Sequence, residues 1–247
     1  MLIRRIISIA LLALATPAWA EDSSVLKVVT TEYPPFEYVE NGELTGSDVA
    51  TVRSVLEMMG YTPRFRVLPW ARAELMTRHG TADLLFSLTK SQERQQHYLF
   101  TDPISVARDV LYARKEAGLS WRTFDDLTGL RVGVSASYSY APEFMAWLTQ
   151  GSARMVVMNQ QEPDLAGLRM VAVGRVDLFI CEQRACDHLI ESNRQRYPDL
   201  DRVTALPGVV GDERFFRAAF SKKHPKADAL RAEFNRTLKR LDLDPSD

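Results

Sequence analysis

The sequence has no surplus of either charge. Its 247 residues carry 31 Lys and Arg against 32 Asp and Glu, a formal net charge of −1. Nucleic-acid-binding domains usually show a basic surplus or stripe, so we expect a protein that does not bind nucleic acid. Twelve Gly and twelve Pro are too few for a collagen-like or low-complexity chain. No period of 20–50 residues is visible, which excludes a solenoid.

Histidine is scarce, and its placement suggests no metal or catalytic site. The chain has four histidines, at positions 79, 97, 188 and 224, without ligand or nucleophile spacing between them. The motifs G-x-S-x-G and H-E-x-x-H, which mark hydrolases and zinc proteases, are both absent. We therefore expect no metal, no cofactor and no catalytic residue.

Cysteine is equally scarce. Cys181 and Cys186 lie five residues apart and form no C-x-x-C motif, so a local disulfide or two buried thiols is favoured over a redox or metal site. A disulfide needs Cα atoms closer than about 7 Å. If both residues lie on one helix, their side chains point apart and no bridge forms.

Long apolar runs are confined to the N-terminus. Arg4 and Arg5 precede an apolar stretch over 6–15, and 17–20 (PAWA) places small residues at the −3 and −1 positions. This pattern is typical of a secretory signal peptide, cleaved after Ala20, and the run is too short to remain as a membrane anchor. Removing it takes the formal charge to −3 and leaves 227 residues, which we expect in the periplasm.

The remaining chain alternates short apolar segments with amphipathic ones. This alternation predicts an α/β fold with mostly parallel sheets. The predicted strands are 25–30, 63–68, 82–86, 110–113, 131–135, 154–158, 176–180 and 215–220. The predicted helices are 48–59, 70–78, 124–129, 142–148, 165–173, 184–193 and 227–241. Ligands of such sheets bind at the carboxyl ends of the strands, and two α/β units favour a cleft between them.

Six motifs, in order, resemble those of the bacterial extracellular solute-binding proteins of family 3, the periplasmic receptors of ABC importers for polar amino acids. They are 33–36 (YPPF), 42–48 (GELTGSD), 80–83 (GTAD), 89–94 (TKSQER) with 99–103 (LFTDP), 126–134 (DLTGLRVGV) and 174–177 (GRVD). Each motif alone is weak, but their order behind a signal peptide is specific.

The resemblance implies the type II periplasmic binding protein fold, with two lobes that each hold a mostly parallel sheet flanked by helices. In this family the chain crosses twice between the lobes. We expect crossings near Tyr112 and near 207–208, with lobe 1 formed by 25–111 and 209–247 and lobe 2 by 112–208.

Arg94 matches the arginine of the family's E-R motif. Its planar guanidinium could hold the α-carboxylate of an amino acid by two parallel hydrogen bonds. The alternative is an arginine paired with a neighbour such as Glu93 on a solvated loop. Ser87 and Thr89, which end the preceding strand, are candidates to donate to the same carboxylate, or else they satisfy loop backbone.

The second lobe supplies the remaining polar candidates. Ser137, Tyr138 and Ser139 follow the strand at 131–135 and should open a helix, whose free N–H groups favour an anion. Glu182 stands where the family usually has an aspartate that binds the ligand's ammonium; the alternative is a surface glutamate.

Three aromatic residues are candidates to wall the ligand's side chain, namely Tyr33, Phe36 and Trp70. A tryptophan at a strand end is often a core residue, so Trp70 is as typical of a core as of a site.

The leading interpretation is therefore a monomeric periplasmic protein that binds an amino acid or a similar zwitterion by lobe closure and delivers it to the membrane subunits of an ABC importer. One alternative is an enzyme on the same fold, similar to a cyclohexadienyl dehydratase. Another is a sensor that presents its ligand state to a membrane receptor.

Overall fold

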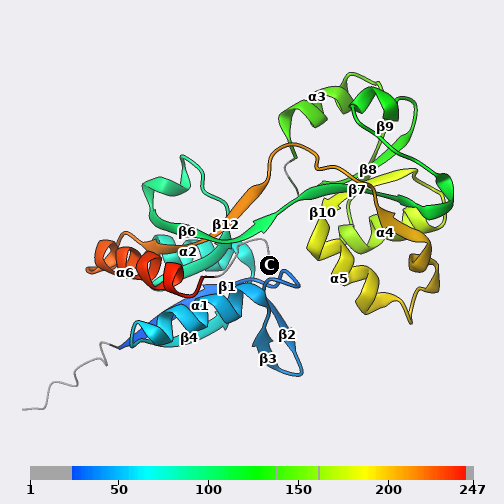
Figure 1. The fold of residues 1–247 in the computed structure, drawn as a ribbon. Helices are drawn as coiled ribbons and strands as arrows, with labels where there is room; N and C mark the ends of the chain where they lie inside the picture. Colours follow the sequence, from blue (N-terminus) through cyan, green and yellow to red (C-terminus); the bar gives the residue numbers. More distant parts are fainter. Residues whose placement is uncertain (1–23, 137, 139, 161, 243–247) are drawn as a thin grey trace, which may run out of the picture.

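Two bodies, each built on a five-stranded sheet, make up the part of the chain that the computed structural model describes (Figure 1). The described residues are 24–136, 138, 140–160 and 162–242. The predicted signal peptide therefore lies outside them. None of the described helices is both long enough and apolar enough to span a membrane.

The first sheet has the strand order β4-β1-β5-β12-β6. Its strands are β1 (Val25–Thr30), β4 (Thr62–Val67), β5 (Leu84–Leu88), β6 (Tyr98–Ala107) and β12 (Arg214–Ser221). With it lie α1 (Ser47–Met58), α2 (Trp70–Arg78), α6 (Ala227–Arg240), η1 (Arg94–Gln96) and the hairpin of β2 (Tyr38–Glu40) and β3 (Glu43–Thr45). We call this body lobe 1.

The second sheet has the order β11-β7-β10-β8-β9. Its strands are β7 (Asp109–Arg114), β8 (Arg131–Ser135), β9 (Arg154–Met158), β10 (Leu178–Glu182) and β11 (Val203–Ala205). With it lie α3 (Pro142–Thr149), α4 (Pro163–Ala172), α5 (Gln183–Asn193), η2 (Lys115–Ala117), η3 (Phe124–Leu127) and η4 (Pro198–Arg202). We call this body lobe 2.

The two sheets follow one plan. In lobe 1, β4, β1 and β5 are parallel, and β12 is antiparallel to both of its neighbours. In lobe 2, β9, β8 and β10 are parallel, and β7 is antiparallel to both of its neighbours. Each sheet is therefore mostly parallel, as predicted, with one strand reversed, because the strand that enters each lobe from the other runs against the βαβαβ unit.

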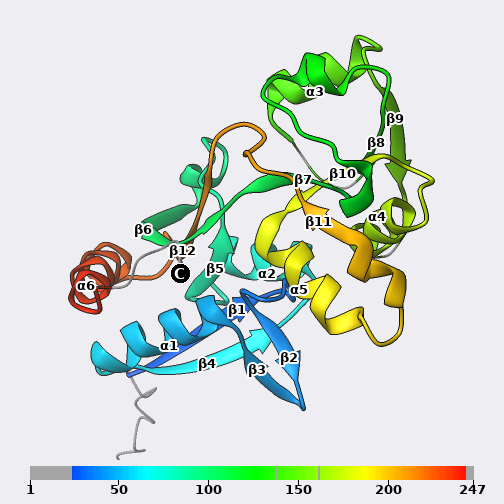
Figure 2. The same ribbon diagram turned by 45° about the vertical axis from the view of Figure 1, so that its right-hand side comes forward.

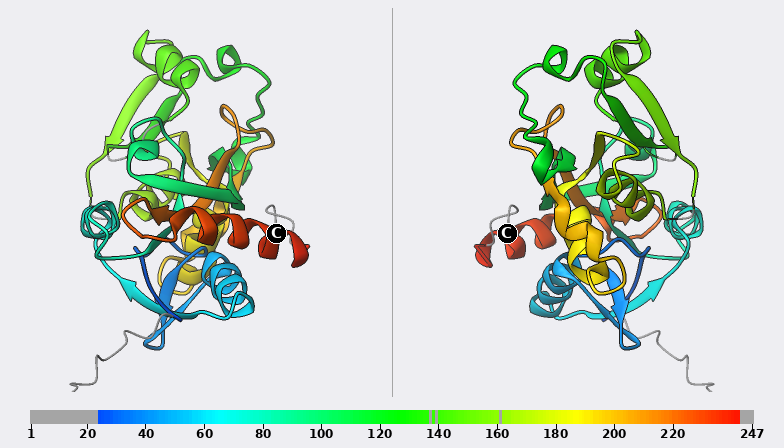
Figure 3. Two further views of the ribbon diagram at one scale, coloured as in Figure 1. Left: turned by 90° about the vertical axis from the view of Figure 1, so that its left-hand side faces the viewer. Right: turned by 90° about the vertical axis from the view of Figure 1, so that its right-hand side faces the viewer.

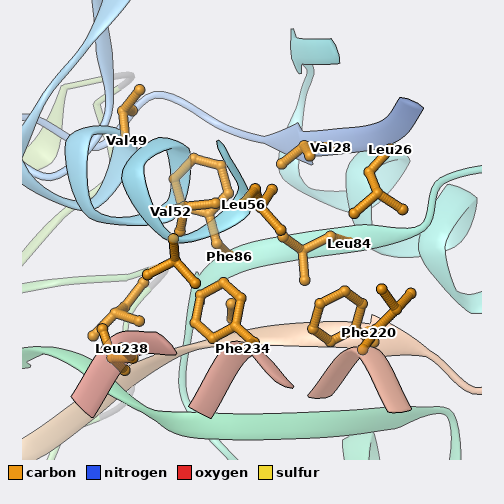
Figure 4. Close-up of a cluster of buried hydrophobic side chains, with 14 of the residues drawn as sticks. Leu26, Val28, Val49, Val52, Leu56, Leu84, Phe86, Phe220, Phe234 and Leu238 are labelled. Carbon is orange, nitrogen blue, oxygen red and sulfur yellow. The ribbon is translucent and has the colours of Figure 1, made fainter. Parts of the chain in front are cut away.

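Period-two alternation along the strands divides each core into two layers. In β1, Val28 faces the cluster under α1 and α6, while Val29 faces the cluster under α2. Figure 4 shows the first of these, where Leu84 and Phe86 of β5 lie between Val52 of α1 above and Phe234 of α6 below. In lobe 2, Phe179 of β10 faces α4 and α5, and Ile180 faces α3. The views of Figure 3 place α6 on the outer side of lobe 1.

The chain crosses between the sheets twice. The first crossing is at Arg108, between β6 and β7, so the expected position near Tyr112 falls inside a strand of lobe 2. The second lies in 206–213, which includes the predicted 207–208. Two ion pairs join the crossings, Arg108 Nε to Glu213 Oε1 at 2.6 Å and Arg214 Nη2 to Asp109 Oδ1 at 2.5 Å.

The largest difference from the sequence prediction is β6, a ten-residue strand that the pattern does not predict. Its Asp102–Pro103 dipeptide is typical of a chain break, but β6 is the edge strand of its sheet, where proline is tolerated. β10 begins two residues later than predicted, so Glu182 becomes its last residue.

Cys181 and Cys186 form a disulfide with a Cα–Cα distance of 6.2 Å. Cys181 belongs to β10 and Cys186 to the first turn of α5, so the two do not share a helix. The turn from strand to helix brings their side chains together. The bridge thereby ties the end of β10 to the start of α5.

Candidate functional site

A cavity of about 400 Å³ lies between the two lobes. The carboxyl ends of the parallel strands β1, β5 and β10 border this cavity. The amino ends of the antiparallel strands β7 and β12 lie at the same sheet edges and border it too. The residues that line it are Thr31, Glu32, Tyr33, Glu37, Trp70, Ser87, Leu88, Thr89, Arg94, Asp109, Tyr138, Tyr140, Glu182, Arg214 and Phe216. Both lobes therefore contribute walls.

Arg94 is the first residue of η1, and its side chain lines the cavity. Its Nε donates to Glu74 Oε1 at 3.0 Å, and its Nη1 donates to the carbonyl and the hydroxyl oxygen of Thr89 at 3.0 and 3.2 Å. The guanidinium also lies 5.3 Å from the centre of the Trp70 ring. The partner is Glu74 of α2 rather than Glu93, and none of these bonds uses Nη2.

Ser87 lines the cavity in an uncommon backbone conformation, with a φ of 60°. Its hydroxyl donates to Asp48 Oδ2 at 2.6 Å, and Ser105 donates to the same oxygen at 3.0 Å. The hydroxyl of Ser87 is therefore bonded to Asp48 of α1, and it also interacts with the carboxyl of Glu37. Thr89, which was predicted with Ser87 to bind the carboxylate, accepts a hydrogen bond from Arg94 through its hydroxyl oxygen.

Glu182 lines the cavity from lobe 2 and is buried. Its Oε2 accepts the backbone N–H of Ala185 at 2.7 Å, which caps α5, and its Oε1 accepts the N–H of Arg108 at 3.3 Å. Burial raises the pKa of this carboxyl, and the backbone N–H groups oppose the rise. The carboxyl is thus fixed between the crossing and the helix.

The three aromatic candidates do not all reach the cavity. Tyr33 and Trp70 line it. Phe36 is fully buried behind Tyr33, with the two rings stacked at 5.6 Å, and it also packs edge-on against Phe216. Phe36 supports the wall rather than forming its surface.

Of the three residues predicted to follow β8, only Tyr138 is described; Ser137 and Ser139 lie outside the described residues. The helix expected to open there begins later, at Pro142. Tyr138 lines the cavity and donates its hydroxyl to Asp164 Oδ2 at 3.0 Å. Burial raises the pKa of Asp164 to about 6.

Sequence reasoning missed several residues of the lining, above all Glu37, Asp109, Arg214 and Phe216. Asp109 and Arg214 open the two strands that follow the crossings, a position that the topology alone assigns to the cleft. Glu37 follows the predicted 33–36 motif directly, and its adjacency was the available signal. Phe216 lies in a predicted strand, where only the sheet order places it at the cavity.

Two carboxyl groups of lobe 2, Glu182 and Asp164, act on Tyr33 in the lobe 1 wall of the cavity. Burial, followed by the nearby charges of Glu182 and Asp164, raises the pKa of the Tyr33 phenol well above its ordinary value. Arg214 opposes this, but it is paired with Asp109. No group of three or more His, Cys, Asp or Glu side chains suited to a metal ion occurs within the described ranges.

The two lobes also touch through α5. Figure 2 shows α5 beside the part of lobe 1 that holds β1 and β2. The guanidinium carbon of Arg184 lies 4.8 Å from the centre of the Phe36 ring, and the His188 ring lies 5.2 Å from that of Tyr38. These residues are one helical turn apart, so one face of α5 packs against lobe 1.

Comparison with known proteins places this geometry in a family. Residues 26–246 match the family described as "Bacterial extracellular solute-binding proteins, family 3". The "Probable amino-acid-binding protein YxeM" of Bacillus subtilis (strain 168) is 28% identical over 228 residues, 91% of this chain and 81% of that protein.

Two solved structures share the fold. A histidine kinase sensor domain with similarity to periplasmic binding proteins has a TM-score of 0.67 and 23% identity, covering 88% of this chain and 90% of that one. The open form of substrate binding domain 2 of Lactococcus lactis GlnP has a TM-score of 0.70 and 14% identity, covering 90% of each chain.

Proposed function

Because the chain belongs to the bacterial extracellular solute-binding proteins of family 3, we propose that it captures an amino acid or a similar zwitterion between its lobes and delivers it to an ABC importer. The observation that carries this proposal is the lining of one cavity by Arg94 of lobe 1 and Glu182 of lobe 2. A zwitterion that enters a dry cleft needs partners for both of its charges.

In this proposal Arg94 binds the α-carboxylate. The bonds from Nε to Glu74 and from Nη1 to Thr89 hold its guanidinium in place, and Nη2 is the group left to donate to the ligand. A guanidinium fixed in advance loses little side-chain entropy when it binds a carboxylate. Tyr33 and Trp70 form the apolar walls beside it.

Glu182 binds the α-ammonium in the same proposal. It belongs to the opposite lobe, so only a closed cleft gives the ligand both ionic contacts. A ligand shifts a conformational equilibrium by the difference between its affinities for the two states. The crossings at Arg108 and 206–213 are the hinge, and the face of α5 with Arg184 and His188, which packs against lobe 1 in this structure, is a contact between the lobes.

The setting of this function extends the same proposal. The chain is exported to the periplasm, is cleaved after Ala20 and acts as a monomer without turnover. The relative from B. subtilis is named for binding rather than for catalysis, which favours a receptor over an enzyme. Incubation with prephenate or arogenate should leave both compounds unconsumed, whereas their conversion would establish the dehydratase alternative.

A sensing role uses the same closed lobes and differs only in the partner. The similarity in fold to a histidine kinase sensor domain supports this second candidate function. Pull-down of the ligand-bound protein with importer subunits or with a membrane kinase separates the two roles.

The binding proposal is tested by thermal shift of the exported chain against amino acids, their decarboxylated amines and their des-amino acids. A ligand that binds only the folded protein raises its melting temperature. The intact amino acid should give the largest shift. In Arg94→Ala the amino acid should raise the melting temperature no more than its decarboxylated amine does. In Glu182→Gln the amino acid should raise it no more than its des-amino acid does.

Arg66→Ala is the matched control, because Arg66 is an exposed arginine of β4 outside the cavity lining. It should leave every shift unchanged. Unaltered amino-acid binding by Arg94→Ala would overturn the assignment of the carboxylate site.

A further inference from the structure

The disulfide of lobe 2 closes a short loop that carries a residue of the cavity lining. Cys181 belongs to β10 and Cys186 to the first turn of α5, and the bridge between them encloses residues 182–185. The first enclosed residue is Glu182, which lines the cavity and binds the ligand's ammonium in the function proposed above. The bridge therefore adjoins a group on which that function depends.

The position of the Glu182 carboxyl depends on the shape of this loop. Its Oε2 accepts the backbone N–H of Ala185, a donor that lies within the loop, at 2.7 Å. Burial raises the pKa of Glu182, and the backbone N–H groups of Ala185, Arg108 and Arg184 oppose the rise. Both Ala185 and Arg184 belong to the loop. A change in the turn from strand to helix would therefore displace donors that hold the carboxylate in place.

Other residues of the loop contact the first crossing and the opposite lobe. The N–H of Gln183 donates to the Arg108 carbonyl at 2.8 Å, and the carbonyl of Gln183 accepts a hydrogen bond from Tyr112 Oη at 2.9 Å. The guanidinium of Arg184 lies over the Phe36 ring of lobe 1. The loop thus meets the cavity, a crossing and lobe 1 at once.

The bridge is the covalent constraint on this turn. Cys181 and Cys186 are 1% and 0% exposed and pack in the core under α4 and α5. The hydrogen bond by which Glu182 caps α5 contributes about 1 kcal/mol by itself, which leaves the first helical turn free to fray. A disulfide across that turn removes the frayed conformations.

We propose that the Cys181–Cys186 bridge positions Glu182 for the ligand's ammonium, so that the oxidised protein binds an amino acid more tightly than the form with two free thiols. The inference rests on the proposed binding function and adds a determinant of affinity to it. A carboxylate fixed in advance loses little side-chain entropy when it binds the ammonium. Cys181 and Cys186 are positioning residues that act through Glu182, and neither belongs to the described lining of the cavity.

Reduction by a dithiol such as dithiothreitol converts the oxidised form into the thiol form. The S–S bond breaks, two electrons and two protons from the dithiol form the thiols of Cys181 and Cys186, and the dithiol closes to a cyclic disulfide. The coupling between bridge and ligand is reciprocal. A bound amino acid therefore stabilises the bridge against reduction by the same factor by which the bridge tightens binding.

The test is titration calorimetry of the exported chain and of Cys181→Ala/Cys186→Ala with an amino acid and its des-amino acid. A thermal-shift screen of the standard L-amino acids selects the probe. Loss of the bridge should weaken binding of the amino acid about tenfold and of the des-amino acid less than about twofold, because only the former carries the ammonium. In a Glu182→Gln background the same loss should change amino-acid binding less than about twofold.

Val171→Ala is the matched control for lost stability. Val171 is fully buried in the same core as the bridge, but it lies on α4 and not in the turn. This variant should melt at a lower temperature and keep both affinities.

A second measurement does not require the thiol form to fold. The amino acid, at saturation, should shift the equilibrium between the wild type and dithiothreitol toward the disulfide about tenfold more than its des-amino acid does at equal occupancy. If the ligands only held the folded chain together, both would protect the bridge equally.

Equal weakening of the amino acid and its des-amino acid, or no weakening of either, would overturn the positioning role and leave the binding function standing. A loss that persists in the Glu182→Gln background would do the same. If the oxidised wild type binds no amino acid, the binding function itself is wrong, and this role of the bridge with it.

Discussion

Lobes 1 and 2 share a sheet plan and differ in the charge they present to the cavity. In each sheet the three parallel strands of a βαβαβ unit lie beside one reversed strand, β12 or β7, which pairs on its other side with an edge strand, β6 or β11. At equivalent sheet edges, lobe 1 presents the guanidinium of Arg94, whereas lobe 2 presents the carboxyl of Glu182 with Asp164 behind Tyr138. The two lobes therefore share a strand order but present groups of opposite charge to the cavity. A ligand that carries both charges finds partners for them only when it contacts both lobes.

The largest effects should come from emptying one core at a time. Phe179→Ala in lobe 2 and Phe234→Ala in lobe 1 should each lower the free energy of unfolding by about 3–5 kcal/mol, because both rings are fully buried. Phe179 packs so closely on Gly167 that a Cβ there would approach its ring to 2.3 Å. Urea unfolding measures the loss, and hydrogen exchange locates it.

If the lobes are separate cooperative units, Phe179→Ala speeds exchange in β8 and β10, and Phe234→Ala speeds exchange in β1 and β5. Met58→Ala, at an exposed position of α1, should change neither. Equal acceleration in both lobes would show that they unfold as one unit.

The next effect compares one buried aspartate from each lobe. The pKa values of Asp48 and Asp164 are raised to about 6, mainly by burial. Between about pH 4 and pH 6 the folded protein binds more protons at these groups than the unfolded chain, so their contribution to stability falls as the pH rises. Each ionised group costs about 3 kcal/mol above pH 6, and this cost is absent below pH 4.

Asp48→Asn and Asp164→Asn should therefore stabilise more, or destabilise less, at pH 7.5 than at pH 4, by about 3 kcal/mol each. Urea unfolding at the two pH values measures this difference. Parallel curves for variant and wild type would contradict the buried charge. Asp177, whose pKa is lowered chiefly by its hydrogen bond with Arg131, should behave oppositely and lose its contribution as the pH falls.

A smaller effect should come from reducing the disulfide between Cys181 and Cys186, which lies in lobe 2. The disulfide closes a loop of six residues in lobe 2, and its reduction should cost about 2 kcal/mol by loss of the constraint on the unfolded chain. Unfolding with and without reductant, followed by hydrogen exchange, should place this loss in lobe 2. The double variant Cys181→Ala/Cys186→Ala should be insensitive to reductant.

The smallest effect concerns the ion pair between the crossings. Arg108 and Glu213 are 37% and 42% exposed, so their coupling should be about 0.2–1 kcal/mol and should weaken with salt. A double-mutant cycle of Arg108→Ala and Glu213→Ala measures it. A coupling of several kcal/mol would mean that the pair is a main brace between the lobes.

The βαβαβ units could be predicted from sequence because their signals are local. Strands 25–30, 131–135 and 154–158 and helix 70–78 match the predicted boundaries, since apolar runs and turn residues define them. β6 and β11 were missed because pairing stabilises them more than pattern does. β12 was predicted as a strand, but nothing in its sequence places it between β5 and β6.

The site divides in the same way. Arg94, Glu182, Tyr33 and Trp70 follow motifs or predicted strand ends, and the cavity brings them together. Their roles in binding stay predictions. Glu74 and Arg214 carry no motif, and the 42–48 motif that contains Asp48 does not indicate its partner, because these side chains meet their neighbours only after the sheets form. The sequence pattern therefore predicts which segments border the site. The partner of each charged side chain depends on how the folded elements pack.

The central place of β12 has a consequence for synthesis. Lobe 2 is encoded without interruption, from β7 to β11, whereas lobe 1 lacks its fourth strand until residues 214–221 have emerged. Until then β5 and β6 have no common neighbour to join them, and each exposes an unpaired edge. The middle of the chain can therefore mature first, while the earlier-made half must wait, open to aggregation, for the last strand to arrive.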